Sequence, residues 1–101
     1  MVIYNITYSV PNELVQYWMI WMQTEHIPEI LATACFERHN LLHLLEMDES
    51  EGKTYALQLH AASEQDYRAY QLNHSPQLRL AAQKKWGDEI MGFRTLMAVL
   101  Q

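Results

Sequence analysis

The sequence predicts a one-domain α+β fold, a four-stranded antiparallel sheet with helices on one face. Two observations predict it: elements follow the order strand, helix, strand, strand, helix, strand, and the two halves resemble each other. The chain has 101 residues, which is the length of one domain, 1–101. Half of the residues are hydrophobic and 19% are charged, so the chain can form a core and intrinsic disorder is excluded.

The first half begins with a strand and continues into a helix. Residues 2–10 alternate between apolar and polar, which is the period of a half-buried strand. Asn12 is expected to cap a helix that runs to about Glu25 and is apolar on more than one face. Because the residue before a proline avoids the α conformation, we expect His26-Ile27-Pro28 to break this helix and a short turn to follow to Leu31.

Two further strands are expected in the middle of the chain. Residues 36–47 contain no glycine or proline, and a polar loop at 48–52 joins them to a third, alternating strand at 54–61. The second strand carries leucines on both sides. Its orientation therefore stays open, and both of its faces need cover.

The second half repeats the plan of the first. Ser63 is expected to cap a helix that ends near His74, a helix restarts at Ser75-Pro76, and residues 90–100 form the last strand. Each half has a histidine two residues before a proline at the end of its helix. Two copies of one βαβ unit form a ferredoxin-like sheet.

The sheet face away from the helices is expected to be partly apolar. We place on it Asn5, Thr7, Ala56, Gln58, His60, Gly92, Arg94, Leu96 and Ala98. An apolar face of this size is rare in monomers, so we expect a homodimer through the open sheet face. Two stacked sheets of this kind could close into a dimeric α/β barrel around a small cavity.

Charge and composition exclude several classes of partner. The formal charge is −5 and the basic residues are scattered, so we expect no nucleic-acid partner. The apolar run at 17–22 is too short to span a membrane, and the N-terminus has no signal-peptide pattern. One cysteine, Cys35, fits a cytoplasmic protein. No metal-binding motif occurs, and we expect neither a metal nor a cofactor.

A few side chains are candidates for chemistry. His26 and His74 fit helix C-terminal ends, where they cap carbonyls, or they serve as acid or base. Arg94 interrupts an apolar strand and needs either an ion pair across the dimer interface or a carboxylate or enolate ligand. Trp18 fits a core stripe or a pocket wall. Arg79 is expected to be a cation on the helix surface.

The chain also resembles a known family along its whole length. The resemblance rests on Trp21-Met-Gln-Thr-Glu-His-Ile-Pro28, Leu31-Ala-Thr33, His74-Ser-Pro76, Leu78-Arg79 and Phe93-Arg-Thr95. These motifs resemble a bacterial family of about 100 residues known only as a domain of unknown function, a branch of the dimeric α/β barrel superfamily. That superfamily includes antibiotic-biosynthesis-type and haem-degrading monooxygenases, muconolactone isomerases and stress-response barrel proteins. The resemblance implies the fold and the dimer, and no particular reaction.

The haem-degrading branch can be compared residue by residue. It has an asparagine on the first strand, where Asn5 would stand, and a tryptophan and a histidine on the second helix. This chain has Tyr67 and Tyr70 in place of the tryptophan, and His74 lies at the helix end before a proline. These differences argue against haem oxidation and leave open a cofactor-free site or no catalysis.

Two functions from different classes follow. The first is a small-molecule pocket with monooxygenase- or isomerase-like chemistry, in which His26, His74 and Arg94 are the catalytic candidates. Its ligand, apolar or carboxylate-bearing, would contact Asn5, Trp18, Tyr67 and Arg94. The alternative is a non-enzymatic dimeric interaction or regulatory module. An RNA-binding sheet ranks last, because the expected sheet aromatics are missing and the charge is negative.

Overall fold

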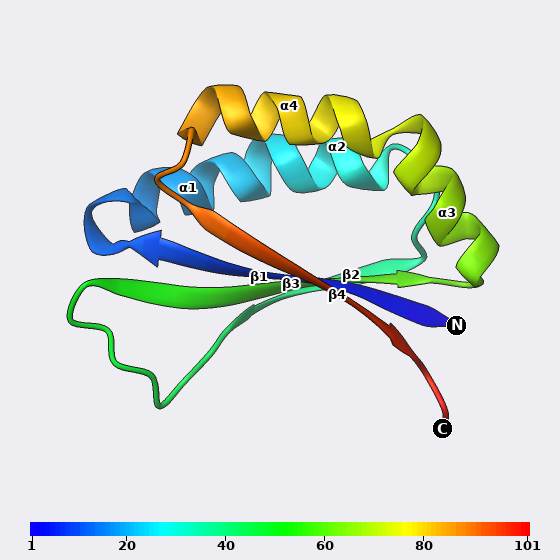
Figure 1. Cartoon of the computed structure of the whole chain (residues 1–101), viewed down its shortest axis with the longest axis horizontal. Helices are drawn as coiled ribbons and strands as arrows, with labels where there is room; N and C mark the ends of the chain where they lie inside the picture. The colour runs from blue at the N-terminus through cyan, green and yellow to red at the C-terminus, as the bar shows by residue number, and fades with distance from the viewer.

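A four-stranded antiparallel sheet carries all the helices on one face, as predicted (Figure 1). The computed structural model describes all 101 residues. The strands are β1 (Val2–Pro11), β2 (Arg38–His43), β3 (Gly52–Ala61) and β4 (Met91–Ala98), in the order β2-β3-β1-β4. The helices are α1 (Val15–Trp21), α2 (Ile27–Leu31), α3 (Glu64–Asn73) and α4 (Ser75–Trp86). This order is that of the ferredoxin-like fold, and the sheet of one chain is open, not a closed barrel.

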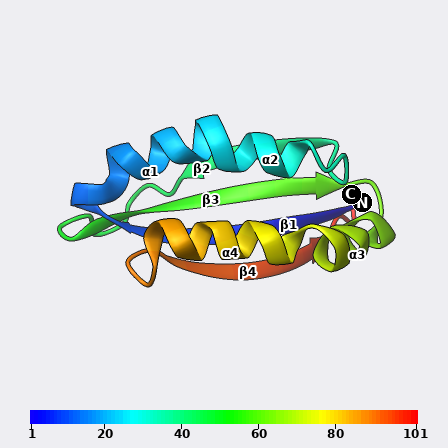
Figure 2. The same cartoon turned by 90° about the horizontal axis from the view of Figure 1, so that it is seen from above.

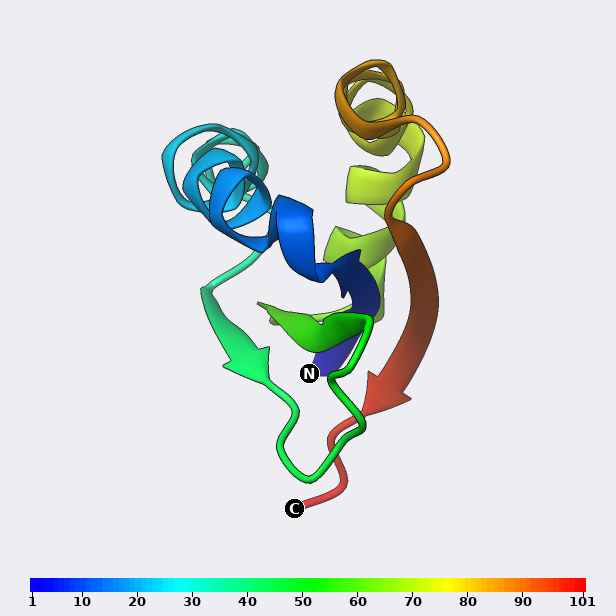
Figure 3. The same ribbon diagram turned by 90° about the vertical axis from the view of Figure 1, so that its left-hand side faces the viewer.

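The helices form two rods along the sheet. Figure 2 shows α1 and α2 in line beside β3, and α4 running along β1 and β4. Figure 3 looks along the rods and shows the other face of the sheet free of helices. No helix combines the length and the apolar character that a membrane crossing requires.

The first rod continues through the expected break at Pro28. A 3₁₀ turn, η1 (Asn12–Leu14), precedes α1, and a π-helical segment, η2 (Met22–His26), joins α1 to α2. The Ile27 N–H donates to the Met22 carbonyl, so the turn before the proline is one residue wider than an α-turn. This wider turn accommodates the missing N–H of Pro28, and the expectation of a break was wrong.

The two predicted caps differ in outcome. Ser63 precedes α3, and its hydroxyl accepts a hydrogen bond from the Asp66 N–H at 3.1 Å, as predicted. Asn12 does not cap a helix. Its side-chain amide instead donates to the carbonyls of Glu49 and Ser50, so it ties the β2–β3 loop to the end of β1.

Arg94 lies on the helix-covered face of the sheet, and the prediction of the open face was wrong. Arg94 pairs with Ile6 across β4 and β1, and Gly92 pairs with Tyr8. Paired residues point to the same side, and Ile6 is buried beneath the helices. The residues Met91–Met97 are apolar at both parities, so the sequence pattern does not set this register.

The remaining assignments to the open face divide in the same way. Leu96 and Ala98 join Arg94 and Gly92 on the helix side, whereas Met91, Phe93, Thr95 and Met97 lie on the open face. Asn5, Thr7, Ala56, Gln58 and His60 lie on the open face as predicted. In β2, Leu41 pairs with Leu57 on the helix side and Leu42 pairs with Ala56 on the open side. The second strand is shorter than the predicted 36–47.

The core lies between the rods and the two central strands. Its largest fully buried side chains are Trp18, Met22, Ile30, Leu57, Leu59 and Val10. The Trp18 ring packs between Tyr8 and Tyr55, with both ring centroids 5.1 Å away. Burial of each such side chain contributes about 1.5–3 kcal/mol, which anchors the first rod on the sheet.

Candidate functional site

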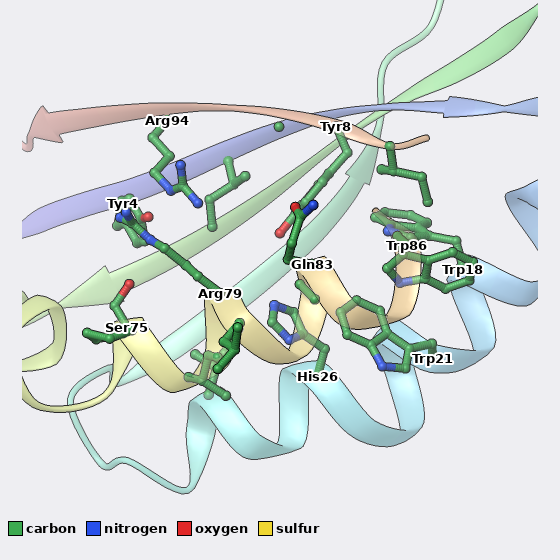
Figure 4. A pocket seen from close by; sticks show the side chains of 18 of the residues that line it. Tyr4, Tyr8, Trp18, Trp21, His26, Ser75, Arg79, Gln83, Trp86 and Arg94 are labelled. Atoms are coloured by element: carbon green, nitrogen blue, oxygen red, sulfur yellow. The ribbon is translucent and has the colours of Figure 1, made fainter. Parts of the chain in front are cut away.

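A cavity of about 540 Å³ lies between the helices and the β1–β4 half of the sheet (Figure 4). Tyr4, Ile6 and Tyr8 of β1 contribute its floor, the first rod contributes one wall and α4 the other. Its volume is within the range of about 300–1,000 Å³ that small-molecule sites occupy. The alternation of β1 explains the floor, since every second residue faces the helices.

His26 is the histidine of this cavity. It is the last residue of η2, is only 8% exposed, and its ring stacks on Trp21 with the centroids 4.4 Å apart. Burial lowers the pKa of His26 from 6.5 to about 4, because a buried imidazolium loses hydration. The imidazole is therefore neutral near pH 7 and able to accept a proton.

Three tyrosines contribute phenol groups to the cavity. Tyr4, Tyr8 and Tyr70 all line it. Burial raises the pKa of Tyr8 and of Tyr70 well above the usual value of 10, and in both cases a nearby tyrosine adds to this effect. These two phenols therefore stay protonated at physiological pH and are hydrogen-bond donors to any ligand oxygen.

Two arginines reach the cavity from opposite sides. Figure 4 shows Arg94 extending from β4 and Arg79 from α4 toward the end where Tyr4 lies. Both guanidinium charges favour the ionised form of the Tyr70 phenol and so lower its pKa. The effect of burial is larger, so the pKa stays above its usual value. The Arg79 guanidinium donates to the Gln71 side-chain oxygen at 3.1 Å, and neither arginine forms a salt bridge.

Indole rings occupy the other end. Trp18, Trp21 and Trp86 line the cavity, and the Trp21 and Trp86 rings meet edge to face with centroids 5.7 Å apart. The Trp86 Nε1 atom is buried without a hydrogen-bond partner. The cavity thus has a cationic end, an aromatic end and a neutral histidine in its lining.

The structure brings together only some of the predicted site residues. His26, Trp18 and Arg94 line the cavity. Asn5 lies on the opposite face of the sheet, where its amide donates to the Thr7 hydroxyl at 3.0 Å.

Tyr67 and His74 lie close to the cavity but outside its lining. Tyr67 packs on Tyr4 with the centroids 5.2 Å apart, and His74 is 6.4 Å from the Tyr70 ring. Contact with a ligand or with the reacting atoms thus remains a prediction for these two residues and for Asn5.

Sequence reasoning missed several residues of the cavity. Arg79 is exposed on α4, as predicted, but its place in the cavity lining was not foreseen, and Tyr4 and Tyr8 were expected only as core residues. A usable signal was present, because a tyrosine on the buried face of a strand brings a polar hydroxyl that needs a partner. Arg79 gave no such signal, since helix-surface arginines are common.

The donor set does not fit haem or a metal ion. Of the positions that the resemblance to the haem-degrading branch suggests, only Tyr70 lines the cavity; Asn5, Tyr67 and His74 do not. No three histidine, cysteine, aspartate or glutamate side chains gather where they could hold a metal.

Comparison with solved structures supports the fold. A dimeric ferredoxin-like protein from an uncultured marine organism superposes with a TM-score of 0.70 at 12% identity, covering 100% of this chain and 96% of the other. An ethyl tert-butyl ether d (EthD) family protein from Bacillus halodurans gives 0.70 at 13% identity, covering 99% and 100%. SnoaB, a cofactor-independent oxygenase from Streptomyces nogalater, gives 0.61 at 13% identity, covering 99% and 93%.

The sequence comparisons identify a family without a reaction. No curated protein matches the chain. The family model described as a domain of unknown function, DUF4286, matches residues 1–100, which agrees with the resemblance seen in the motifs. Because the match covers nearly the whole chain, this protein belongs to the DUF4286 family.

Proposed function

We propose that this protein is a homodimer whose cavity binds a small molecule and transfers a proton, as an isomerase or a cofactor-free oxygenase does. One observation carries the proposal: a buried, neutral His26 lines the same cavity as Arg94 and two protonated tyrosines. A base and groups that stabilise an oxyanion are the two parts that proton abstraction beside a carbonyl needs.

His26 is the group of the cavity that can accept a proton. Burial holds its pKa below the usual 6.5, so the imidazole is deprotonated at pH 7. A C–H beside the carbonyl of an aromatic ketone suits this site, because a group that stabilises the oxyanion lowers the cost of removing that proton. Arg94 then stabilises the enolate oxygen. Protonation at another carbon completes an isomerisation, and reaction of the carbanion with O₂ begins an oxygenation. The similarity in fold to SnoaB, a cofactor-independent oxygenase, supports the oxygenation.

Deuterium exchange into anthrone, an enolisable aromatic ketone, tests the proposal. We expect the protein to accelerate exchange at the anthrone methylene in anaerobic D₂O, followed by proton NMR. His26→Ala is expected to reduce this acceleration by about 100-fold or more, the usual contribution of a general base. His39→Ala removes an exposed imidazole of β2 outside the cavity lining and is the control. Equal rates for wild type and His26→Ala would refute a role of His26 as the base.

The evidence for a homodimer comes from the uncovered face of the sheet. Phe93 and Met91 of β4 are 62% and 59% exposed there, and Leu42 of β2 is 43% exposed. Water-exposed apolar side chains on one face favour association with a matching face, and a second copy supplies it. The similar fold of a protein described as dimeric supports the same arrangement.

A non-enzymatic dimeric module is the second candidate. The same exposed apolar side chains favour it, because they serve assembly whether or not the cavity is used. This candidate predicts a stable dimer that leaves the exchange rate of anthrone unchanged. The NMR experiment therefore separates the two functions.

A further inference from the structure

The cavity contains two positive charges and no acidic side chain. Arg79 and Arg94 are among its 20 lining residues, none of which is aspartate or glutamate. The two salt bridges of the chain, His43–Glu49 and Arg68–Glu64, involve neither arginine. Both arginines are exposed to water, and Figure 4 shows their side chains directed toward the same end of the cavity, where Tyr4 lies. A bound anion at that end accepts guanidinium hydrogen bonds in the planar, two-point geometry that arginine prefers.

Neutral donors surround the same end of the cavity. The Tyr70 phenol lies within the field of both guanidinium groups, and the Tyr4 ring is tilted toward it with ring centroids 6.2 Å apart. Ser75, only 3% exposed, adds a hydroxyl to the lining (Figure 4). Since none of these groups is negatively charged when protonated, they add hydrogen bonds to an oxyanion without offsetting the arginine charges.

The rest of the cavity favours a flat apolar body. Trp18, Trp21 and Trp86 line it, and Ile6, Ile30 and Ile90 add aliphatic side chains to the lining. Aromatic rings pack favourably in offset or edge-to-face contact with other aromatic rings. A small inorganic anion would leave these walls without contacts, whereas a ring system would cover them.

We propose that the ligand is a planar aromatic oxyanion, held at its charged group by Arg79 and Arg94 together and packed with its ring against the tryptophans. This inference rests on the proposed function only in placing a ligand in the cavity. It adds the ligand's class and makes Arg79, from α4, a second determinant of specificity beside Arg94. The charged group can be a carboxylate or a phosphate ester, since guanidinium pairs with either.

Calorimetric titration with three ligands of the same ring system tests the proposal. The probes are 2-naphthoate, 2-naphthyl phosphate and the neutral 2-naphthamide. We expect at least one anion to bind about tenfold or more tightly than the amide, since a charged hydrogen bond contributes enough for that difference. Whichever anion binds more tightly identifies the charged group.

Substitutions locate the effect. Arg79→Gln and Arg94→Gln are each expected to weaken anion binding about tenfold while leaving naphthamide binding unchanged. Arg68→Gln, which removes an exposed arginine paired with Glu64 on α3, is the matched control.

The outcomes separate the two proposals. Equal affinity for all three probes, or no effect of either cavity substitution, would overturn the anion site and leave the small-molecule cavity standing. Absence of any binding up to millimolar concentration, with all variants folded by circular dichroism, would overturn both.

Discussion

At the scale of single residues, His26 differs most between what the sequence suggested and what the structure shows. Its place before Ile27-Pro28 suggested a helix end with a favourable dipole, which would stabilise the charged ring. In the structure it lies inside a continuous rod, stacked on Trp21, and burial lowers its pKa to about 4. Burial therefore exceeds any effect of the helix, and the imidazole is neutral near pH 7 in place of a cationic cap.

The pKa of His26 makes the stability of the protein depend on pH. The folded state takes up the His26 proton at about pH 4 and the unfolded chain at 6.5, so the free energy of unfolding is undiminished above pH 6.5 and decreases as the pH falls toward 4. The full difference is about 3 kcal/mol. Urea denaturation of His26→Gln at pH 7.5 and pH 4.5 should show a smaller loss on acidification than wild type.

Two other features define the control for this experiment. Burial also lowers the pKa of His60, so part of the acid sensitivity persists in His26→Gln. Leu72→Gln changes an exposed side chain that does not titrate, so we expect its loss of stability between the two pH values to match that of wild type. An equal loss in His26→Gln and wild type would contradict the assignment.

At the scale of elements, the order and type of strands and helices followed from the sequence, but their exact geometry did not. Alternation identified the 2–10 strand, and Ser63 identified the start of α3. The face of β4 could not be predicted, because that strand is apolar at both parities and register depends on its pairing with β1. For the same reason it was not foreseeable that Arg79 and Arg94 reach one cavity: this depends on where α4 and β4 lie in the folded chain, which no local pattern encodes.

Gly52 shows how closely two elements approach. It opens β3 opposite Pro11, and a Cβ atom placed on it would lie 2.6 Å from the Val10 carbonyl oxygen. Because that oxygen belongs to the backbone of β1, Gly52→Ala should force the strands apart and destabilise the fold by about 1–3 kcal/mol in thermal or urea denaturation. Gly92→Ala is the control, since its Cβ would meet the Ile6 side chain at 3.4 Å. A loss no larger than that of Gly92→Ala would contradict this explanation.

At the scale of the whole molecule, the two faces of the sheet have different roles. The helix-covered face contains the core and the candidate site, and the other face carries apolar side chains without cover (Figure 3). A polar group, made of Asn5, Thr7, Gln58 and His60, lies among them. A partner that covers this face must therefore match both apolar and polar positions, and a second copy related by a two-fold axis is self-complementary in this way.

The dimer proposal gives the last prediction. Phe93 pairs with Thr7 on the uncovered face and is 62% exposed in one chain, so in a dimer it is a candidate for the aromatic anchor of the interface. We expect wild type to sediment as a dimer at micromolar concentration, and Phe93→Glu to weaken the dimer by about 30-fold or more, because it removes an anchor and buries a charge. Leu72→Glu is the matched control, because Leu72 is 79% exposed on α3, away from that face. A monomeric wild type would refute the dimer. A Phe93→Glu protein that dimerises as tightly as wild type would refute the sheet face as the interface. Either result would leave the proposal for the cavity intact, because the cavity lies on the opposite face of the sheet within one chain.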